Sequence, residues 1–114
     1  MTFLFWLKII LAVATMAFGA MSIVSPSAAE RFTGLTAAGP RGISEIRAVL
    51  GGLFVGLGLA AVIYRTASAF GTVGIGYLVI GVVRAASIYF DKAPTPSNWL
   101  SLAFEFAFGI LLLI

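Results

Sequence analysis

Residues 76–91 read GYLVIGVVRAASIYFD, an apolar stretch that carries one arginine and ends on an aspartate. If this stretch is the second half of a membrane helix, Arg84 lies about 9 Å short of the helix's polar end, at about 1.5 Å per residue. An arginine near the middle of a membrane helix costs roughly 2.5 to 3.5 kcal/mol, so a position facing lipid is unfavourable. We therefore expect Arg84 to face other helices and to pair with an acidic residue, and Glu105 in the next apolar segment is the natural candidate.

The composition is that of an integral membrane protein. Of the 114 residues, 61% are hydrophobic and only 10% are charged, and the mean hydropathy is +1.14. Soluble domains are far more polar. The length allows one domain, residues 1–114, with about four spans of roughly 20 residues each. The expected fold is an all-α, antiparallel four-helix membrane bundle. Its predicted spans are residues 3–24, 43–64, 67–90 and 98–114.

The residue types that are missing exclude much familiar chemistry. The chain has no cysteine and no histidine, so it has no disulfide, no thiolate nucleophile and none of the commonest metal ligands. No motif for a cofactor is present, and we predict no catalytic residue, no metal and no cofactor. The net charge of +3 is scattered along the chain, which favours contact with lipid headgroups over nucleic acid.

Helical spacing places small and hydroxyl residues on one face of the first span. We expect this face to contact another helix, because such residues let membrane helices approach closely. Large residues such as Leu11 are expected to lie outside this face. The face consists of Lys8, Ala12, Thr15, Gly19 and Ser22.

A second interpretation of this span is a cleaved signal peptide. Ser27, Ala28 and Ala29 resemble the small residues of a cleavage site. The chain lacks the basic leader of such peptides and its apolar run is long, so we expect an uncleaved membrane helix. Residues 25–42 then form one long connection outside the hydrocarbon, either a lid or a contact surface, from which Phe32 can pack back against the helices. A helix start is expected at Gly39-Pro40.

The second span has small residues on two faces. Glu45, Ala48, Gly52, Gly56 and Ala60 share one face, whereas Arg47, Gly51 and Gly58 lie about 200° away from Glu45. We predict that Gly51, Gly52 and Gly56 pack against other helices, since the spacing of Gly52 and Gly56 is typical of close helix contacts.

The third and fourth spans each place polar residues on one face. In the third span this face carries Phe70, Gly74, Tyr77, Gly81 and Arg84. The predicted interior face of the fourth span carries Asn98, Ser101, Glu105 and Gly109, and Ser97 or Asn98 is expected to cap the helix.

With four spans, the connections after the first and third helices lie on the same side of the membrane. The sequence therefore predicts a buried polar cluster in that leaflet, with the Arg84–Glu105 pair at its centre. Three interpretations stay open: a structural ion network, a pocket for a small amphiphile or lipid headgroup, and a relay for protons or ions. The predicted cluster consists of Glu45, Arg47, Tyr77, Arg84, Asp91 and Glu105.

We expect an interaction or structural membrane protein, with amphiphile binding as the alternative, ion or proton transport less favoured, and catalysis least. The expected partners are the lipid bilayer and either a membrane-protein partner or further copies of the chain.

The residues Ser44-Glu45-Ile46-Arg47-Ala48-Val49-Leu50-Gly51-Gly52 form a recognisable opening of a helix. With this segment, Arg84, Asp91 and Glu105, the chain resembles small bacterial four-helix membrane proteins of the domain-of-unknown-function family 4345, which are distantly similar to the DoxX-like group. The resemblance covers nearly the whole chain and implies the four-helix fold and the charged cluster. It implies no activity.

We expect the protein in the inner (plasma) membrane with both termini on one side. Lys8 and Arg65 mark the side of the termini, and Arg31, Arg41 and Lys92 mark the other. The count of basic residues alone favours the long connection on the cytoplasmic side, but the first helix often dominates topology and Lys8 lies at its start, so we predict cytoplasmic termini.

Overall fold

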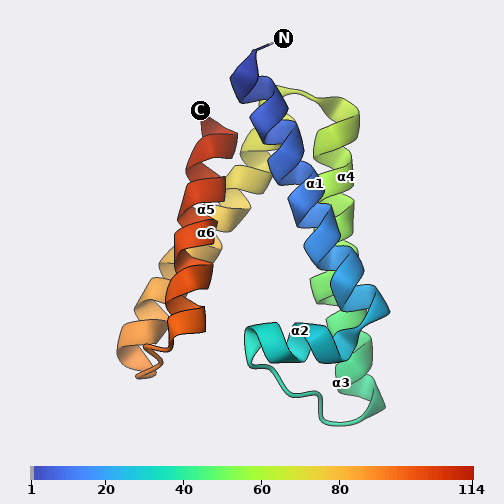
Figure 1. Cartoon of the computed structure of the whole chain (residues 1–114), viewed down its shortest axis with the longest axis vertical. Coiled ribbons are helices and arrows are strands. Elements are labelled where there is room, and N and C mark those ends of the chain that lie inside the picture. The colour runs from blue at the N-terminus through green and yellow to red at the C-terminus, as the bar shows by residue number, and fades with distance from the viewer. Residues whose placement is uncertain (1) are drawn as a thin grey trace. The chain divides into compact units, whose positions relative to one another are not determined.

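The computed structural model describes residues 2–114, and every regular element in that range is a helix (Figure 1). Four helices are long and apolar enough to cross a membrane, which confirms the all-α membrane fold class. The chain divides into two compact units, one ending at Tyr64 and one beginning at Arg65. The four candidate spans are Phe3–Val24, Pro40–Tyr64, Ala67–Phe90 and Pro96–Leu113.

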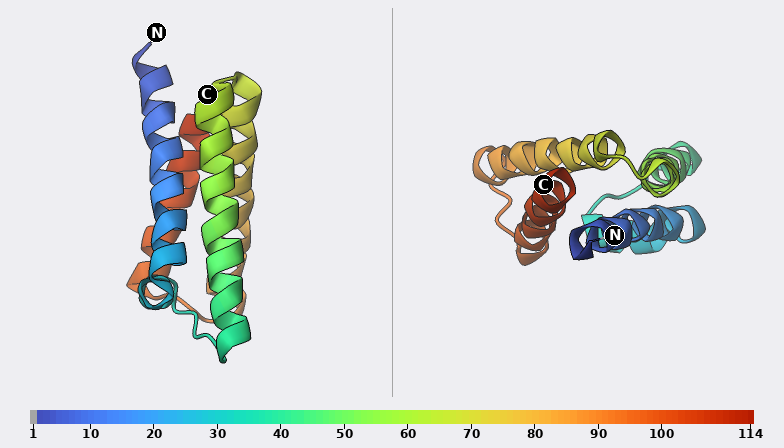
Figure 2. Two further views of the ribbon diagram at one scale, coloured as in Figure 1. Left: turned by 90° about the vertical axis from the view of Figure 1, so that its right-hand side faces the viewer. Right: turned by 90° about the horizontal axis from the view of Figure 1, so that it is seen from above.

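The first unit is an antiparallel helix pair. Helix α1 (Phe3–Val24) starts at Thr2, whose hydroxyl accepts a hydrogen bond from the Phe5 amide at 3.2 Å. Its partner begins at Pro40, three residues earlier than the predicted span, because proline suits the first helical turn. Figure 2 shows the two helices side by side. The partner helix runs through α3 (Pro40–Glu45), a π-helical segment η1 (Ile46–Leu53) and α4 (Phe54–Tyr64).

The packing face of α1 is the predicted one: Ala12, Thr15, Gly19 and Ser22 are all buried. The two hydroxyls are satisfied within the helix, since each donates to the carbonyl four residues earlier, Thr15 to Leu11 at 2.9 Å and Ser22 to Phe18 at 3.1 Å. The prediction for Leu11 was wrong, because this side chain is buried too. It lies only about 60° from the centre of the face, and packed helix faces are wider than the stripe of small residues alone.

Glycine lets the backbones of this pair touch. A methyl group on Gly19 would lie 2.6 Å from the Gly51 carbonyl oxygen and 2.7 Å from the Val55 nitrogen, which is too close for any side chain. One on Gly58 would lie 2.6 Å from the Ala12 carbonyl oxygen. Of the two small-residue faces of Pro40–Tyr64, the one with Gly51 and Gly58 therefore packs on α1.

The connection after α1 holds a helix that we did not predict, α2 (Pro26–Thr33). It begins with Ser25, whose hydroxyl accepts from the Ala28 amide, has Pro26 in its first turn, and ends at Gly34 with a φ of 80°. Figure 1 shows α2 running across the end of the pair, and the Phe32 ring lies 5.8 Å from that of Phe18, as expected for a side chain that packs back.

The second unit is the antiparallel pair of α5 (Ala67–Phe90) and α6 (Pro96–Leu113). Thr66 caps α5 through a bond from the Ala69 amide at 3.1 Å. Thr95 caps α6, so the prediction of Ser97 or Asn98 as the cap was wrong. The reason is Pro96, which fits the first helical position and leaves the residue before it to act as the cap.

The two helices contact each other through the predicted faces. Phe70, Gly74 and Gly81 are buried on α5, and Glu105 and Gly109 are buried on α6. A methyl group on Gly74 would lie 2.9 Å from the Gly109 carbonyl oxygen. This close approach holds α5 and α6 in the register that brings Arg84 opposite Glu105.

Candidate functional site

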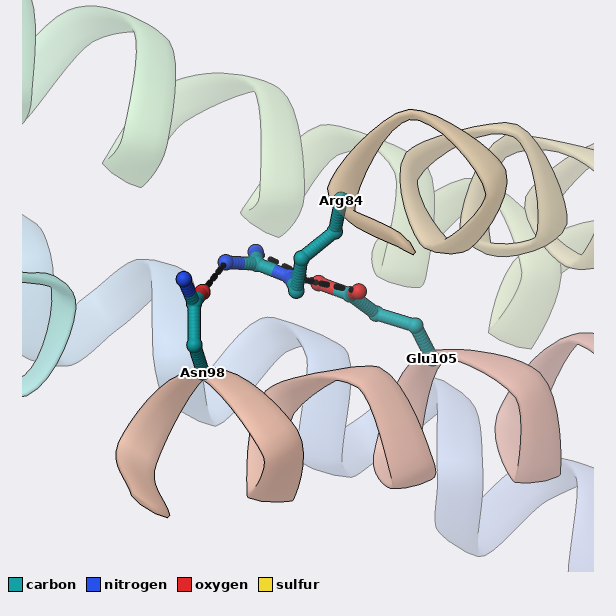
Figure 3. A network of polar contacts seen from close by, with 3 residues as sticks. All are labelled: Arg84, Asn98 and Glu105. Atoms are coloured by element: carbon teal, nitrogen blue, oxygen red, sulfur yellow. Dashed lines mark hydrogen bonds and ion pairs between the residues drawn. The ribbon is translucent and has the colours of Figure 1, made fainter. Parts of the chain in front are cut away.

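Arg84 and Glu105 form a two-point ion pair between α5 and α6 (Figure 3). The Nε of Arg84 donates to both carboxylate oxygens of Glu105, at 2.7 and 3.0 Å, and Nη2 donates to Oε2 at 2.7 Å. This is the side-on geometry in which a planar guanidinium matches a carboxylate best. The predicted central pair is therefore present in the structure.

Asn98 holds the other side of the same guanidinium. Its Oδ1 accepts from Nη1 of Arg84 at 2.8 Å, and its Nδ2 donates to the Ala93 carbonyl at 3.0 Å. Because an arginine only donates and a carbonyl only accepts, these two bonds fix the orientation of the amide. Asn98 precedes Glu105 by seven residues, which is two helical turns, so both side chains reach Arg84 from one face of α6.

The pair is largely shielded, with 10% of the Glu105 side chain and 31% of the Arg84 side chain exposed. Among the described residues, no buried side-chain nitrogen or oxygen lacks a hydrogen-bond partner. The charges are thus neutralised and hydrogen-bonded together, which is the condition for keeping an ion pair at this depth.

A pocket opens beside the guanidinium. It is an open depression with a volume of about 390 Å³, and it combines exposed aliphatic side chains of α5 with polar groups from both helices. The hydroxyl of Ser87 donates to Asp91 Oδ2 at 2.6 Å, so this rim of the pocket is ordered by a further hydrogen bond. The pocket is lined by Val79, Ile80, Val83, Arg84, Ser87 and Asn98.

The remaining residues of the predicted cluster have other contacts. Asp91 is exposed and bonds to Ser87, not to Arg84. The ring of Tyr77 packs edge-on against Phe108, with centroids 5.4 Å apart.

Glu45 and Arg47 belong to the first unit. Glu45 forms an exposed ion pair with Arg41, one helical turn away. Arg47 donates from Nη1 to the Ile23 carbonyl at 2.7 Å, where a cation suits the carboxyl end of α1. That these two residues share one cluster with Arg84 stays a prediction.

The predicted packing glycines differ in their surroundings. Gly51 is buried against Gly19 and Ile23 of α1. Gly52 and Gly56 are exposed, and a methyl group on Gly56 would meet nothing within 4 Å. Their role as packing positions stays a prediction, because the α1 contact does not use them.

Sequence reasoning placed Asn98 on the interior face but missed that it binds Arg84, and it missed Ser87. The signal for Asn98 was its two-turn spacing from Glu105. Ser87 lies three residues after Arg84 and four before Asp91, on neighbouring turns of α5.

Residues 2–114 form an all-α structure with four candidate membrane spans and the buried Arg84–Glu105 ion pair, which fits a multi-pass protein of the lipid bilayer. The chain belongs to the family described as "Domain of unknown function (DUF4345)", whose model matches residues 3–114. This finding confirms the resemblance. No curated protein and no solved structure matches the chain.

Proposed function

We propose that this protein binds a small amphiphile in the pocket beside Arg84. The observation that carries the proposal is the combination, in one pocket, of aliphatic walls and a guanidinium. Pockets for small ligands are mostly apolar, with a few polar groups that fix orientation, and have volumes of about 300 to 1,000 Å³. The pocket of about 390 Å³ is at the small end of that range.

The ion pair supports this role because it leaves Arg84 both neutralised and reachable. Glu105 occupies the Nε side of the guanidinium, while 31% of the arginine side chain remains exposed. A polar head can therefore approach Arg84 while an apolar tail contacts Val79, Ile80 and Val83. Such a ligand matches what a membrane offers, since its tail comes from an apolar medium.

A structural role is the second candidate. Glu105 and Asn98 both reach from α6 to one side chain of α5, so the pair specifies which helix faces meet. Buried polar residues in some other proteins fix the register of helices in this way. In that case the protein acts through its surface, as an interaction partner of other membrane proteins, and the pocket stays without a ligand.

Native mass spectrometry of the purified protein separates the two functions. Ile80→Trp places a bulky ring in the pocket and leaves Arg84, Asn98 and Glu105 unchanged. We expect the wild type to carry an amphiphile as a mass adduct and Ile80→Trp to lose it. The matched control is Ile75→Trp on the same helix, because Ile75 is exposed but does not line the pocket.

An adduct that survives Ile80→Trp at the wild-type level would place the ligand elsewhere. A wild type that carries no adduct, and binds none when amphiphiles are added, would leave the structural role as the explanation of the ion pair.

A further inference from the structure

The hydrogen-bonding capacity of the pocket is mostly that of donors. A guanidinium has five N–H groups. Three of them are used by Glu105 and Asn98, so within the described residues two N–H groups of Arg84, one on each Nη, have no partner. The Asn98 amide likewise retains one N–H after its bond to Ala93. A ligand head that carries acceptor oxygens would satisfy these groups.

The charge of the pocket is already balanced. Arg84 contributes one positive charge and Glu105 cancels it at hydrogen-bond distance. Asp91, which bonds to Ser87, and Lys92 after it are both exposed, and neither lines the pocket, so these opposite charges leave the balance unchanged. An anionic head would therefore meet a pair with no net charge, and it would lose its hydration without gaining an unpaired counter-charge. A cationic head would face the guanidinium of Arg84, the charged side chain in the pocket lining, and would be repelled by it.

We infer that the ligand is an uncharged amphiphile whose head carries carbonyl or ether oxygens, such as an ester, and not an anionic lipid or a fatty-acid anion. This inference rests on the proposed function, since it names the ligand class of the same pocket. The two unpaired N–H groups of Arg84 bind the acceptor oxygens, and the Glu105 carboxylate disfavours anions. The tail lies along the aliphatic side chains of α5.

The test uses two photoreactive probes that have the same decyl tail, which carries a diazirine, and differ only in their heads. One probe has a glycerol ester head and the other a sulfonate, which stays charged at any working pH. The full-length protein is reconstituted in nanodiscs of an uncharged phospholipid, irradiated with each probe, and the labelled residues are mapped by mass spectrometry. Labelling of residues 10–13, which include the exposed Ile10 and Val13, measures contact with bulk lipid.

We expect the ester probe to label residues 79–87 above that background, and excess decanoylglycerol to remove the excess labelling. The sulfonate should label these residues about tenfold less, a factor equal to about 1.4 kcal/mol in binding free energy, because Glu105 already neutralises Arg84. In Glu105→Gln the selectivity should fall, because the charge that neutralises Arg84 is gone, while Glu45→Gln should keep the wild-type ratio.

The outcomes separate the two levels of the proposal. If neither probe labels residues 79–87 above background, the pocket is not a ligand site and the proposed function fails. If the sulfonate labels them as strongly as the ester or more strongly, the pocket stands and the inference about the head is overturned. A wild-type selectivity that is unchanged in folded Glu105→Gln would also overturn the electrostatic explanation.

Discussion

Arg84 is a charged residue in an apolar helix, and Glu105 offsets the cost of burying this charge by forming an ion pair with it. The carboxylate meets the guanidinium at two points, and Asn98 takes a third N–H. A buried pair of this kind contributes little compared with well-packed apolar residues, but removing one member leaves a charge without its partner. We therefore expect the loss of one member of the pair to lower the free energy of unfolding more than the loss of both members.

Glu105→Gln should therefore destabilise the protein by about 3 kcal/mol, because Arg84 keeps its charge and loses the counter-charge. Replacing both residues, with Arg84→Met and Glu105→Leu together, should recover most of that loss. The measurement is unfolding by denaturant in mixed micelles, arranged as a double-mutant cycle.

Glu45→Gln is the matched control, since it makes the same change in an exposed carboxylate. Its pair with Arg41 is an i,i+4 contact on a helix surface, which is worth about 0.3 to 0.5 kcal/mol. Equal losses in Glu45→Gln and Glu105→Gln would contradict the structural distinction drawn between the two carboxylates and would favour the larger cluster predicted from the sequence.

At the level of elements, the contact between α1 and its partner depends on backbone approach. Gly19 faces the Gly51 carbonyl and the Val55 nitrogen, and backbone atoms cannot rotate aside as a side chain can. Such close approach of two helices favours their association through van der Waals contact.

We predict that Gly19→Ala separates these helices and lowers the free energy of unfolding by about 1 to 3 kcal/mol, the usual range for overpacking. Gly56→Ala is the comparison, because its methyl group meets open space and alanine favours helix over glycine. The same denaturant experiment measures both. A loss in Gly56→Ala as large as that in Gly19→Ala would show that the Gly52–Gly56 face also packs against a helix.

At the level of the whole molecule, the sequence predicts a single domain, and only Arg65 and Thr66 separate the two helix pairs. The two tryptophans make this testable, since Trp6 lies in α1 and Trp99 in α6. We predict that Trp6→Phe and Trp99→Phe, each leaving one fluorescent reporter, unfold at the same midpoint, and that adding Glu105→Gln shifts both midpoints equally. A shift seen by Trp99 alone would show that the pairs unfold independently.

The orientation in the membrane is a further whole-molecule prediction. The chain has no cysteine, so single cysteines placed at Thr36 and Thr66 report without background. With cytoplasmic termini, an impermeant thiol reagent added outside should label Thr36→Cys and leave Thr66→Cys unmodified until the membrane is opened. Labelling of Thr66→Cys alone from outside would reverse the topology.

Much of this architecture follows from composition and periodicity. Apolar stretches of about 20 residues in a chain with 10% charged residues form membrane helices, because the backbone must satisfy its own hydrogen bonds in lipid. Pairing of Arg84 with Glu105 was predictable for a similar reason: a buried cation needs an anion, and Glu105 is the one acidic residue of the last span. The residues through which α1 and α5 each pack against a neighbouring helix were also predictable, from helical spacing alone.

Other features depend on which surfaces meet, and these needed the tertiary structure. Pro40–Tyr64 has small residues on two faces, so the sequence alone did not distinguish the Gly51–Gly58 face from the Gly52–Gly56 face, and the close contact with Gly19 identified the former. Helix α2 is too short for a periodic signal and was missed. The pocket beside Arg84 was not predictable because a cavity is set by side chains of two helices after they pack, and no single segment encodes its volume.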